Sequence, residues 1–371
     1  MPYPNDLVIP STVFYEASAY TVTGIAATTF AYCKQLTSVK IPDSVKSIGG
    51  EAFADCTGLT SINIPNSVKS IGYCAFVGCT ALTSIKLPDG MKSIEEGLFG
   101  ECRNLTSVNI PDGVTNIKSL AFEKCTSLTS VNIPDGVTNI GKSAFSGCTS
   151  LTSVNIGKGV KNIESYAFKN CSNLNTLNLN CTEVCDWFRD ILLQVTSVTL
   201  GDNVKNISYS VFTDSGITAI NIPDGVTSIG EWAFLACTKL KSVYIGKGVT
   251  SIGNEVFYDC HSLTSVTSYG IKPFTINNTV FKNNSSNCIL YVPEGTKDAY
   301  IAAGWTEEVF KGGIVEMEPT GLQDVTQESL PTNADCYYDL NGRPHNQLQR
   351  GLNIIRMSDG TVKKTIFFNT P

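Results

Sequence analysis

Cysteine is the residue type with the most chemical potential in this chain, which contains 14 Cys among 371 residues. Most of them recur three residues after a repeated phenylalanine: Cys33, Cys56, Cys79, Cys102, Cys125, Cys148, Cys171, Cys237 and Cys260. If successive repeats stack as neighbouring strands do, these side chains lie about 5 Å apart, whereas the Cβ atoms of a disulfide lie about 3.8 Å apart. We therefore predict a buried column of free thiols that pack as small apolar side chains.

Two other cysteines could contribute ligands to zinc. Cys181 and Cys185 have the spacing Cys-x-x-x-Cys. A structural zinc site needs four ligands, and no second Cys or His pair lies near them in the sequence. We predict no metal site here.

Acidic side chains also recur, in a Pro-Asp-Gly type of turn: Asp43, Asp89, Asp112, Asp135 and Asp224. Stacked carboxylates are ligands that calcium prefers, so a calcium site is one interpretation. The alternative is that each Asp accepts amide hydrogen bonds within its own turn. We favour the second interpretation, because carboxylates about 5 Å apart in water repel each other by only about 1 kcal/mol and need no cation.

Histidine is too scarce to support acid–base catalysis. The chain contains His261 and His345, and neither accompanies a recurring Ser, Cys or carboxylate. The Gly-Lys-Gly segments at 157–159 and 246–248 lack the spacing of a phosphate-binding loop. We predict no catalytic residue and no cofactor, with an enzyme as a remote alternative.

Polar side chains at the centre of short apolar triplets, such as Val131-Asn132-Ile133, are the remaining candidates. In a half-buried strand the central residue points outward. This set comprises Lys40, Asn63, Lys86, Asn109, Asn132, Asn155, Asn178, Thr199, Asn221, Tyr244 and Thr267. One interpretation is an Asn ladder whose amides bond to one another. The other is a ligand-binding strip formed by Asn109, Asn132, Asn155, Asn178, Asn221 and Tyr244, centred near Tyr244 and Thr267.

A repeat of 23 residues must position all these side chains. It is marked by Phe30, Phe53, Phe76, Phe99, Phe122, Phe145 and Phe168, and the series continues at Phe188, Phe212, Phe234, Phe257 and Phe281. Residues 128–150 show the unit: a strand, a Pro-Asp-Gly turn, a second short strand and a short helical or irregular corner. Such a period is typical of solenoids, and it predicts about twelve stacked coils.

The full unit, LTSVNIPDGVTSIG..AF.GC, resembles the BspA-like leucine-rich repeat family of bacterial surface proteins from about Leu7 to Glu316. The resemblance implies a β-rich leucine-rich-repeat solenoid, an extracellular or cell-surface location, and binding of a host extracellular protein or glycan. It also implies that the outward strand face is the ligand surface.

Breaks in the repeat predict five segments. Residues 1–26 form a first coil and cap with a hairpin inserted at Val13 to Tyr20, 27–287 form the solenoid, and 288–316 form a C-terminal cap of strand, helix and strand. Residues 317–335 form a linker and 336–371 a small β module. This last segment is similar to short C-terminal modules of secreted proteins, some of which are sorting signals. A helical variant of the corner is expected at Cys181 to Leu193.

Composition excludes several function classes. The net charge is −6 and charged residues make up 16% of the chain, so no basic stripe for nucleic acid is present. No apolar run reaches the roughly 20 residues of a membrane helix. The sequence shows no signal peptide at residues 1–10, which leaves open an intracellular protein or a mature fragment. We expect a non-enzymatic surface or secreted protein, with a structural spacer as the alternative.

Overall fold

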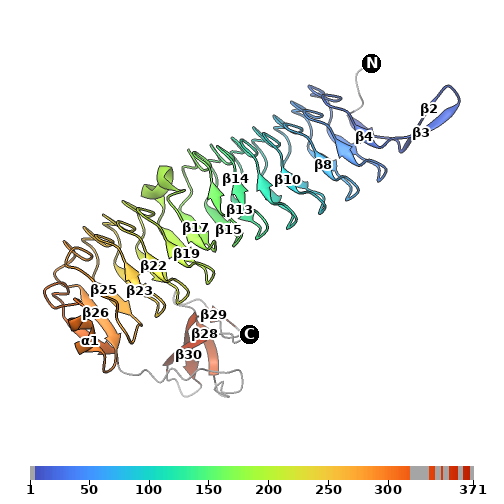
Figure 1. Cartoon of the computed structure of the whole chain (residues 1–371). Helices are drawn as coiled ribbons and strands as arrows, with labels where there is room; N and C mark the ends of the chain where they lie inside the picture. The colour runs from blue at the N-terminus through green and yellow to red at the C-terminus, as the bar shows by residue number, and fades with distance from the viewer. Residues whose placement is uncertain (1–4, 318–333, 339–343, 346–350, 358–361, 368–371) are drawn as a thin grey trace. The chain divides into compact units, whose positions relative to one another are not determined.

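The computed structural model describes residues 5–317, 334–338, 344–345, 351–357 and 362–367. The chain divides into two compact units, Met1–Val315 and Glu316–Pro371. The first unit is a row of stacked coils (Figure 1). None of the described helices has the length and apolar character needed to span a membrane.

The first strand of each coil builds a parallel ladder in which equivalent residues are in register, as Val131 is with Val154. These thirteen strands, one coil more than the repeat count predicted, are β1 (Asp6–Val8), β5 (Ser38–Lys40), β7 (Ser61–Asn63), β9 (Ser84–Lys86), β11 (Ser107–Asn109), β13 (Ser130–Ile133), β15 (Ser153–Ile156), β17 (Thr176–Leu179), β19 (Ser197–Leu200), β21 (Ala219–Ile222), β23 (Ser242–Ile245), β25 (Ser265–Ser268) and β26 (Ile289–Pro293). The predicted solenoid is confirmed.

A second parallel ladder consists of the two-residue strands that follow the turn in most coils. They are β4 (Gly24–Ile25), β6 (Ser47–Ile48), β8 (Ser70–Ile71), β10 (Ser93–Ile94), β12 (Asn116–Ile117), β14 (Asn139–Ile140), β16 (Asn162–Ile163), β18 (Glu183–Val184), β20 (Asn206–Ile207), β22 (Ser228–Ile229) and β24 (Ser251–Ile252). The second residue of these strands, Ile in all but β18, is buried in the core except for the partly buried Ile252. The coils with a second strand therefore have two strand faces with the core between them.

The corner that follows the second strand is irregular rather than helical, which is the second of the two predicted alternatives. Residues 51–55, around Phe53, form turns. Glu51 and Asp55 both have φ of +55°, a left-handed conformation that no α-helix contains. The N–H of Phe53 donates to the carbonyl of Ala75 in the next coil (2.9 Å), so the corner is stabilised between coils. Only the irregular coil has helix at this place, the 3-10 helix η1 (Arg189–Gln194).

The repeated phenylalanines form one column of stacked rings. Successive centroids lie 5.1–5.7 Å apart from Phe30 to Phe188 and again from Phe212 to Phe281. Phe188, from the irregular coil, stacks on Phe168 at 5.3 Å. Offset stacking of this kind adds to the stabilisation from apolar burial. Because the rings stack, the column fixes the rotation of each coil relative to the next. The outer strand faces of successive coils are therefore aligned.

The two ends of the first unit differ from the repeat. An antiparallel hairpin, β2 (Thr12–Tyr15) with β3 (Ser18–Thr21), lies where an inserted hairpin was expected and projects away from the coils (Figure 1). At the other end β26 is followed by α1 (Lys297–Ala302) and β27 (Ile314–Met317), and Trp305 is fully buried. The segment limits at 26, 287, 316 and 335 remain predictions.

The second unit contains a four-stranded antiparallel sheet. Its order is β29-β28-β30-β31, formed by β28 (Ala334–Tyr338), β29 (Pro344–His345), β30 (Gly351–Met357) and β31 (Val362–Phe367). Residues 318–333 of the predicted linker lie outside the described residues, as do the Asn341-Gly342 and Asp359-Gly360 turns. A sorting role for this module remains a prediction.

Candidate functional site

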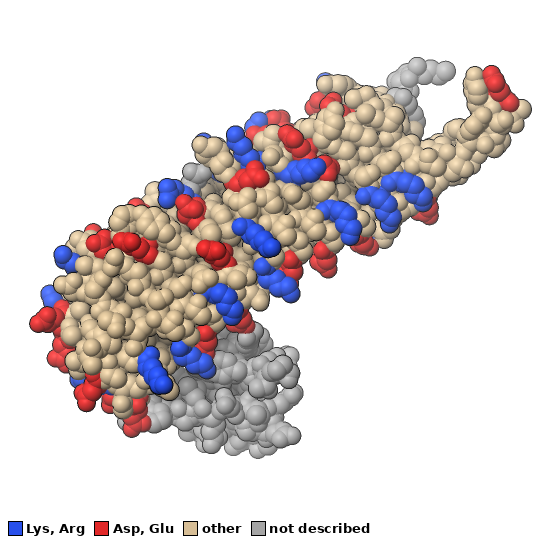
Figure 2. Space-filling model, in the orientation of Figure 1, with Lys and Arg blue, Asp and Glu red and all other residues tan. Residues whose placement is uncertain are grey.

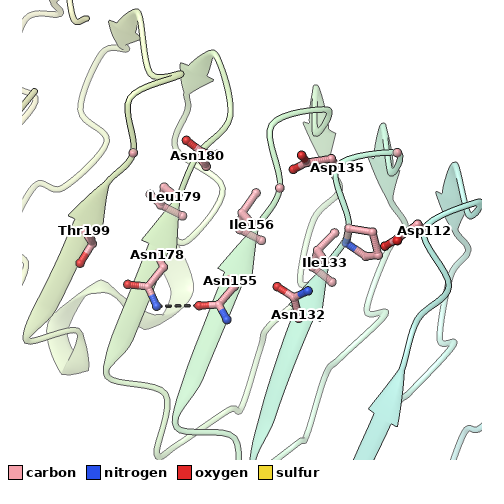
Figure 3. A pocket seen from close by; sticks show the side chains of 14 residues that line it. Asp112, Asn132, Ile133, Asp135, Asn155, Ile156, Asn178, Leu179, Asn180 and Thr199 are labelled. Atoms are coloured by element: carbon pink, nitrogen blue, oxygen red, sulfur yellow. Dashed lines mark hydrogen bonds between the residues drawn. The ribbon is translucent and has the colours of Figure 1, made fainter. Parts of the chain in front are cut away.

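The first-strand ladder places the predicted site residues in one column. Asn132, Asn155 and Asn178 are successive partners in register, and Asn221 is the partner of Tyr244. Asn109, on β11, pairs instead with Lys86 on β9. The side chains of Asn132, Asn155 and Asn178 project from the same face of their strands (Figure 3).

Thr267 does not belong to the exposed part of this column, and the prediction that it points to solvent is wrong. Its exposed fraction is only 8%. It is in register with Tyr244 on one side and Tyr291 on the other. A short side chain between two tyrosines on adjacent strands is covered by its neighbours.

The amide ladder is only partial. The amide of Asn178 donates to the side-chain oxygen of Asn155 at 2.6 Å (Figure 3). Among the described residues this is the one amide–amide bond in the strand-face column. The remaining amides of the column are therefore left with capacity to bind a ligand, because each Asn offers both donors and an acceptor.

A groove of about 660 Å³ lies along this column. Asn132, Asn155, Asn178 and Thr199 line it from the strands, and Asp112, Asp135, Gly157, Asn180 and Gly201 from the turns. None of the described residues in its lining is Lys or Arg. Three of the six predicted ligand-binding residues therefore meet in one hollow.

The proline of the turn is missing from three consecutive coils that line the groove. Pro134 is followed, at the same position of later coils, by Gly157, Asn180 and Gly201. Asn180 and Gly201 have the N–H that proline lacks, and they donate to Ile156 (3.0 Å) and Leu179 (2.8 Å). The hollow lies beside these three residues. Sequence reasoning missed these residues, although the sequence itself shows that proline is absent from this position in the three coils.

The same hydrogen bonds lengthen the ladder. Strands β5 to β11 have three residues each, whereas strands from β13 to β25 have four. Glycine allows close approach at this point: a Cβ on Gly157 would lie 2.6 Å from the carbonyl oxygen of Ile133. The floor of the groove is thus backbone held tightly between coils.

The turn carboxylates bond across coils rather than within their own turns, which corrects the prediction for Asp135 and Asp224. The N–H of Lys158 donates to Asp135 Oδ1 (3.0 Å), and Lys158 Nζ lies 3.3 Å from Asp135 Oδ2. Asp224 and Lys247 repeat the arrangement at 3.0 Å and 3.5 Å. The backbone and then the side-chain hydrogen bond from Lys158 lower the pKa of Asp135. Each of these carboxylates has a cationic partner.

The buried cysteines of the column share one hydrogen bond to the preceding coil. Cys148 Sγ donates to the carbonyl of Phe122 in the preceding coil at 3.2 Å, and the other buried members repeat this bond. Burial raises the pKa of Cys56 and of Cys125 to about 12. The cysteines that the structure describes with their side chains are all free. The thiols of Cys56 and Cys125 therefore stay protonated at neutral pH and act as packing groups with one donor.

Metal-binding side chains do not cluster in the described part of the chain, where no group of three or more His, Cys, Asp or Glu could hold an ion. Cys181 is buried, and Cys185 Sγ lies 3.7 Å from Ser208 Oγ. His261 Nδ1 lies 2.9 Å from the carbonyl oxygen of Asn283, and His345 belongs to β29 in the other unit. The groove is thus the candidate site that the geometry offers.

Comparison with known proteins identifies the repeat. The family described as BspA type Leucine rich repeat region matches residues 23–135, 92–188 and 188–288, in six copies. No curated protein matches the chain.

Solved structures similar to the chain are also repeat proteins. A leucine-rich repeat protein from Bacteroides ovatus is 25% identical, with 84% of this chain and 92% of that chain covered and a TM-score of 0.38. A leucine rich cell surface protein from Faecalibacterium prausnitzii is 27% identical, with 71% and 88% covered and a TM-score of 0.36. The pneumococcal vaccine antigen PcpA is 20% identical, with 84% and 89% covered and a TM-score of 0.42. The repeat match itself covers most of the solenoid, and the chain therefore belongs to the BspA-type leucine-rich repeat family.

Proposed function

We propose that this chain is a non-enzymatic, adhesin-like protein of the bacterial surface or secreted fraction. It binds a host extracellular protein or glycan through the first-strand face of its solenoid. The observation that carries this proposal is the groove beside Asn132, Asn155 and Asn178. A repeated polar column with a hollow on one strand face is a surface suited to binding, whereas no described group of side chains is suited to catalysis.

The groove argues for binding over the alternative of a structural spacer. A spacer requires the core columns and the backbone ladders, and coils with Pro42, Pro65 or Pro88 already supply both. Replacing proline by Gly157 and Gly201 gives the unfolded chain more freedom to lose on folding, which is unfavourable. A change of this kind in consecutive coils fits selection for a binding surface.

A binding experiment with a matched control tests this function. Purified protein is passed over immobilised extracellular-matrix proteins and a glycan array, together with the double variant Asn155→Ala, Asn178→Ala. The control is Asn63→Ala, which removes an exposed amide from the same column outside the groove. We expect the double variant to lose binding and the control to keep it.

Two results would contradict the proposal. The first is the absence of binding to every matrix protein and glycan, which would favour the spacer. The second is binding that the double variant leaves unchanged, which would place the ligand elsewhere. Thermal unfolding of each variant checks that it is folded.

A further inference from the structure

The strand face changes character toward its C-terminal end, from amides to tyrosines. Beyond the groove the column continues through Asn221, Tyr244, Thr267 and Tyr291. Tyr244 and Tyr269 are both 40% exposed, and Tyr291 is half-buried. Three phenol rings therefore gather on three consecutive coils of the face that also holds the groove.

The backbone of Tyr269 is bonded to the preceding coil, next to a hydrogen-bonded tyrosine of the cap. The N–H of Tyr269 donates to the carbonyl of Ile245 at 3.0 Å. Just beside it, the buried hydroxyl of Tyr300 donates toward Ser268 Oγ and the Gly270 carbonyl, each at 2.7 Å. Burial, and then the proximity of Tyr244 and Asp224, raise the pKa of Tyr269, which keeps its hydroxyl protonated.

Charge on this face is compensated within the protein. Lys158 is paired with Asp135, and Lys247 with Asp224. Lys and Arg side chains are interspersed with Asp and Glu along the visible face of the unit (Figure 2). A polyanion such as a sulfated glycan needs an excess of cations, which the groove lining does not supply.

We propose that the ligand of this face is a neutral, linear oligosaccharide that lies along the solenoid axis, across the strands. Tyr244, Tyr269 and Tyr291 stack on sugar rings at one end, and Asn132, Asn155 and Asn178 bond hydroxyl groups in the groove. This inference rests on the proposed function and selects glycan as the ligand class.

The chemistry of the two parts fits a sugar chain. An aromatic ring packs on the apolar C–H face of a pyranose, and its electron-rich face attracts the polarised hydrogens. Amide side chains both donate and accept, as sugar hydroxyls do. Tyrosine is also favoured in protein interfaces, so the choice between the two ligand classes rests on the groove. A protein partner is anchored by exposed Trp, Tyr, Arg or large apolar side chains at the centre of the patch. The described residues of the groove lining include no Trp, Tyr or Arg. Its large apolar side chains, Ile133, Ile156 and Leu179, are buried.

The dimensions also fit an extended ligand. Adjacent coils are about 4.8 Å apart, so the eight strands from β13 to β26 span about 34 Å in seven steps. The coil spacing is close to the length of one sugar unit in an extended chain. Successive sugars can therefore meet equivalent side chains of successive coils.

Calorimetric titration with neutral polysaccharides (xylan, mannan and a β-glucan), with heparin as the charged comparison, tests this inference. We expect binding to at least one neutral polymer, with about tenfold or greater weakening in Tyr244→Ala and in Tyr269→Ala. Tyr244→Phe should keep most of the affinity, because it keeps the ring. Tyr166→Ala is the matched control, since Tyr166 is also exposed and lies in a corner rather than on the strand face.

The outcomes separate the two proposals. Binding to a matrix protein that survives enzymatic removal of its glycans and is unaffected by Tyr244→Ala would overturn the glycan inference and leave the binding function standing. Preference for heparin over all neutral polymers would overturn it as well. Failure to bind any protein or glycan would remove both. Circular dichroism of each variant shows that a loss of affinity does not reflect unfolding.

Discussion

The two ends of the solenoid use their aromatic side chains in opposite ways. At the C-terminal end Tyr300, Trp305 and Phe310 are fully buried. In the N-terminal hairpin Phe14 is 78% exposed, and Tyr15 and Tyr20 are exposed as well. Aromatic content alone therefore does not make a cap.

The difference lies in where the backbone of each segment is bonded. Strand β26 continues the parallel ladder from β25, which carries the cap over the last coil. Trp305 then packs beside Phe281 with centroids 5.6 Å apart, and its Nε1–H donates to the Phe274 carbonyl at 2.9 Å. In the hairpin, β2 and β3 pair with each other, and its aromatics are left outside. A segment covers the core only when its backbone joins the stack.

The largest effect is expected from Trp305→Ala. Removing a fully buried Trp leaves a cavity beside Phe281 and Phe310, and the expected loss is about 3–5 kcal/mol of unfolding free energy. Because each coil of a solenoid contacts only its neighbours, fraying should begin in the last coils. Urea unfolding measures the loss, and hydrogen exchange should show reduced protection first in β23 to β26. Phe14→Ala is the control, with a change within about 0.5 kcal/mol. Similar losses for the two variants would contradict the comparison.

Alkaline pH should act on both ends through buried thiols. Burial raises the pKa of Cys56, toward the N-terminal end, and of Cys288, in the cap, from 9.0 to about 12. Because the folded pKa lies above the unfolded value, the stabilisation is fully present below pH 9 and is lost as pH rises toward 12. Unfolding midpoints in urea should therefore fall across this window.

Cys56→Ala and Cys288→Ala should each make that fall shallower while lowering stability at pH 7. The two variants sharpen the comparison, because equal pH effects would show that both ends exclude water equally from a buried thiol. An unchanged pH profile in both variants would contradict the role of these thiols.

The buried columns could be predicted from the sequence, and the exceptions have local physical causes. The spacing of Phe and Cys fixed their inward position because a stacked repeat must place equivalent residues one above another. Thr267 escaped prediction because its burial depends on the size of Tyr244 and Tyr291 on neighbouring coils. The form of the corner was left open because its left-handed residues, such as Glu51, are ordinary in sequence and are held by bonds to the next coil.

The candidate site was predicted only in part. The polar column through Asn155 followed from the alternation of each strand. The groove beside it did not, because it is lined by several coils together, in which Gly157 and Gly201 replace proline and Asn180 adds a ladder bond. A hollow is a property of several coils in register, and a single repeat does not reveal it.

The smallest effect on stability is expected from removing the hairpin, and this prediction tests the comparison most directly. The N–H of Val22 donates to the Ser11 carbonyl at 2.9 Å, so the base of the hairpin is already closed. Replacing Thr12–Thr21 by two glycines should change the unfolding free energy by no more than about 0.5 kcal/mol, because every replaced side chain is exposed. Urea unfolding with the Trp305→Ala variant in parallel provides the scale. A loss of unfolding free energy close to that of Trp305→Ala would contradict this prediction. It would mean that the hairpin covers the first coil, as the C-terminal cap covers the last.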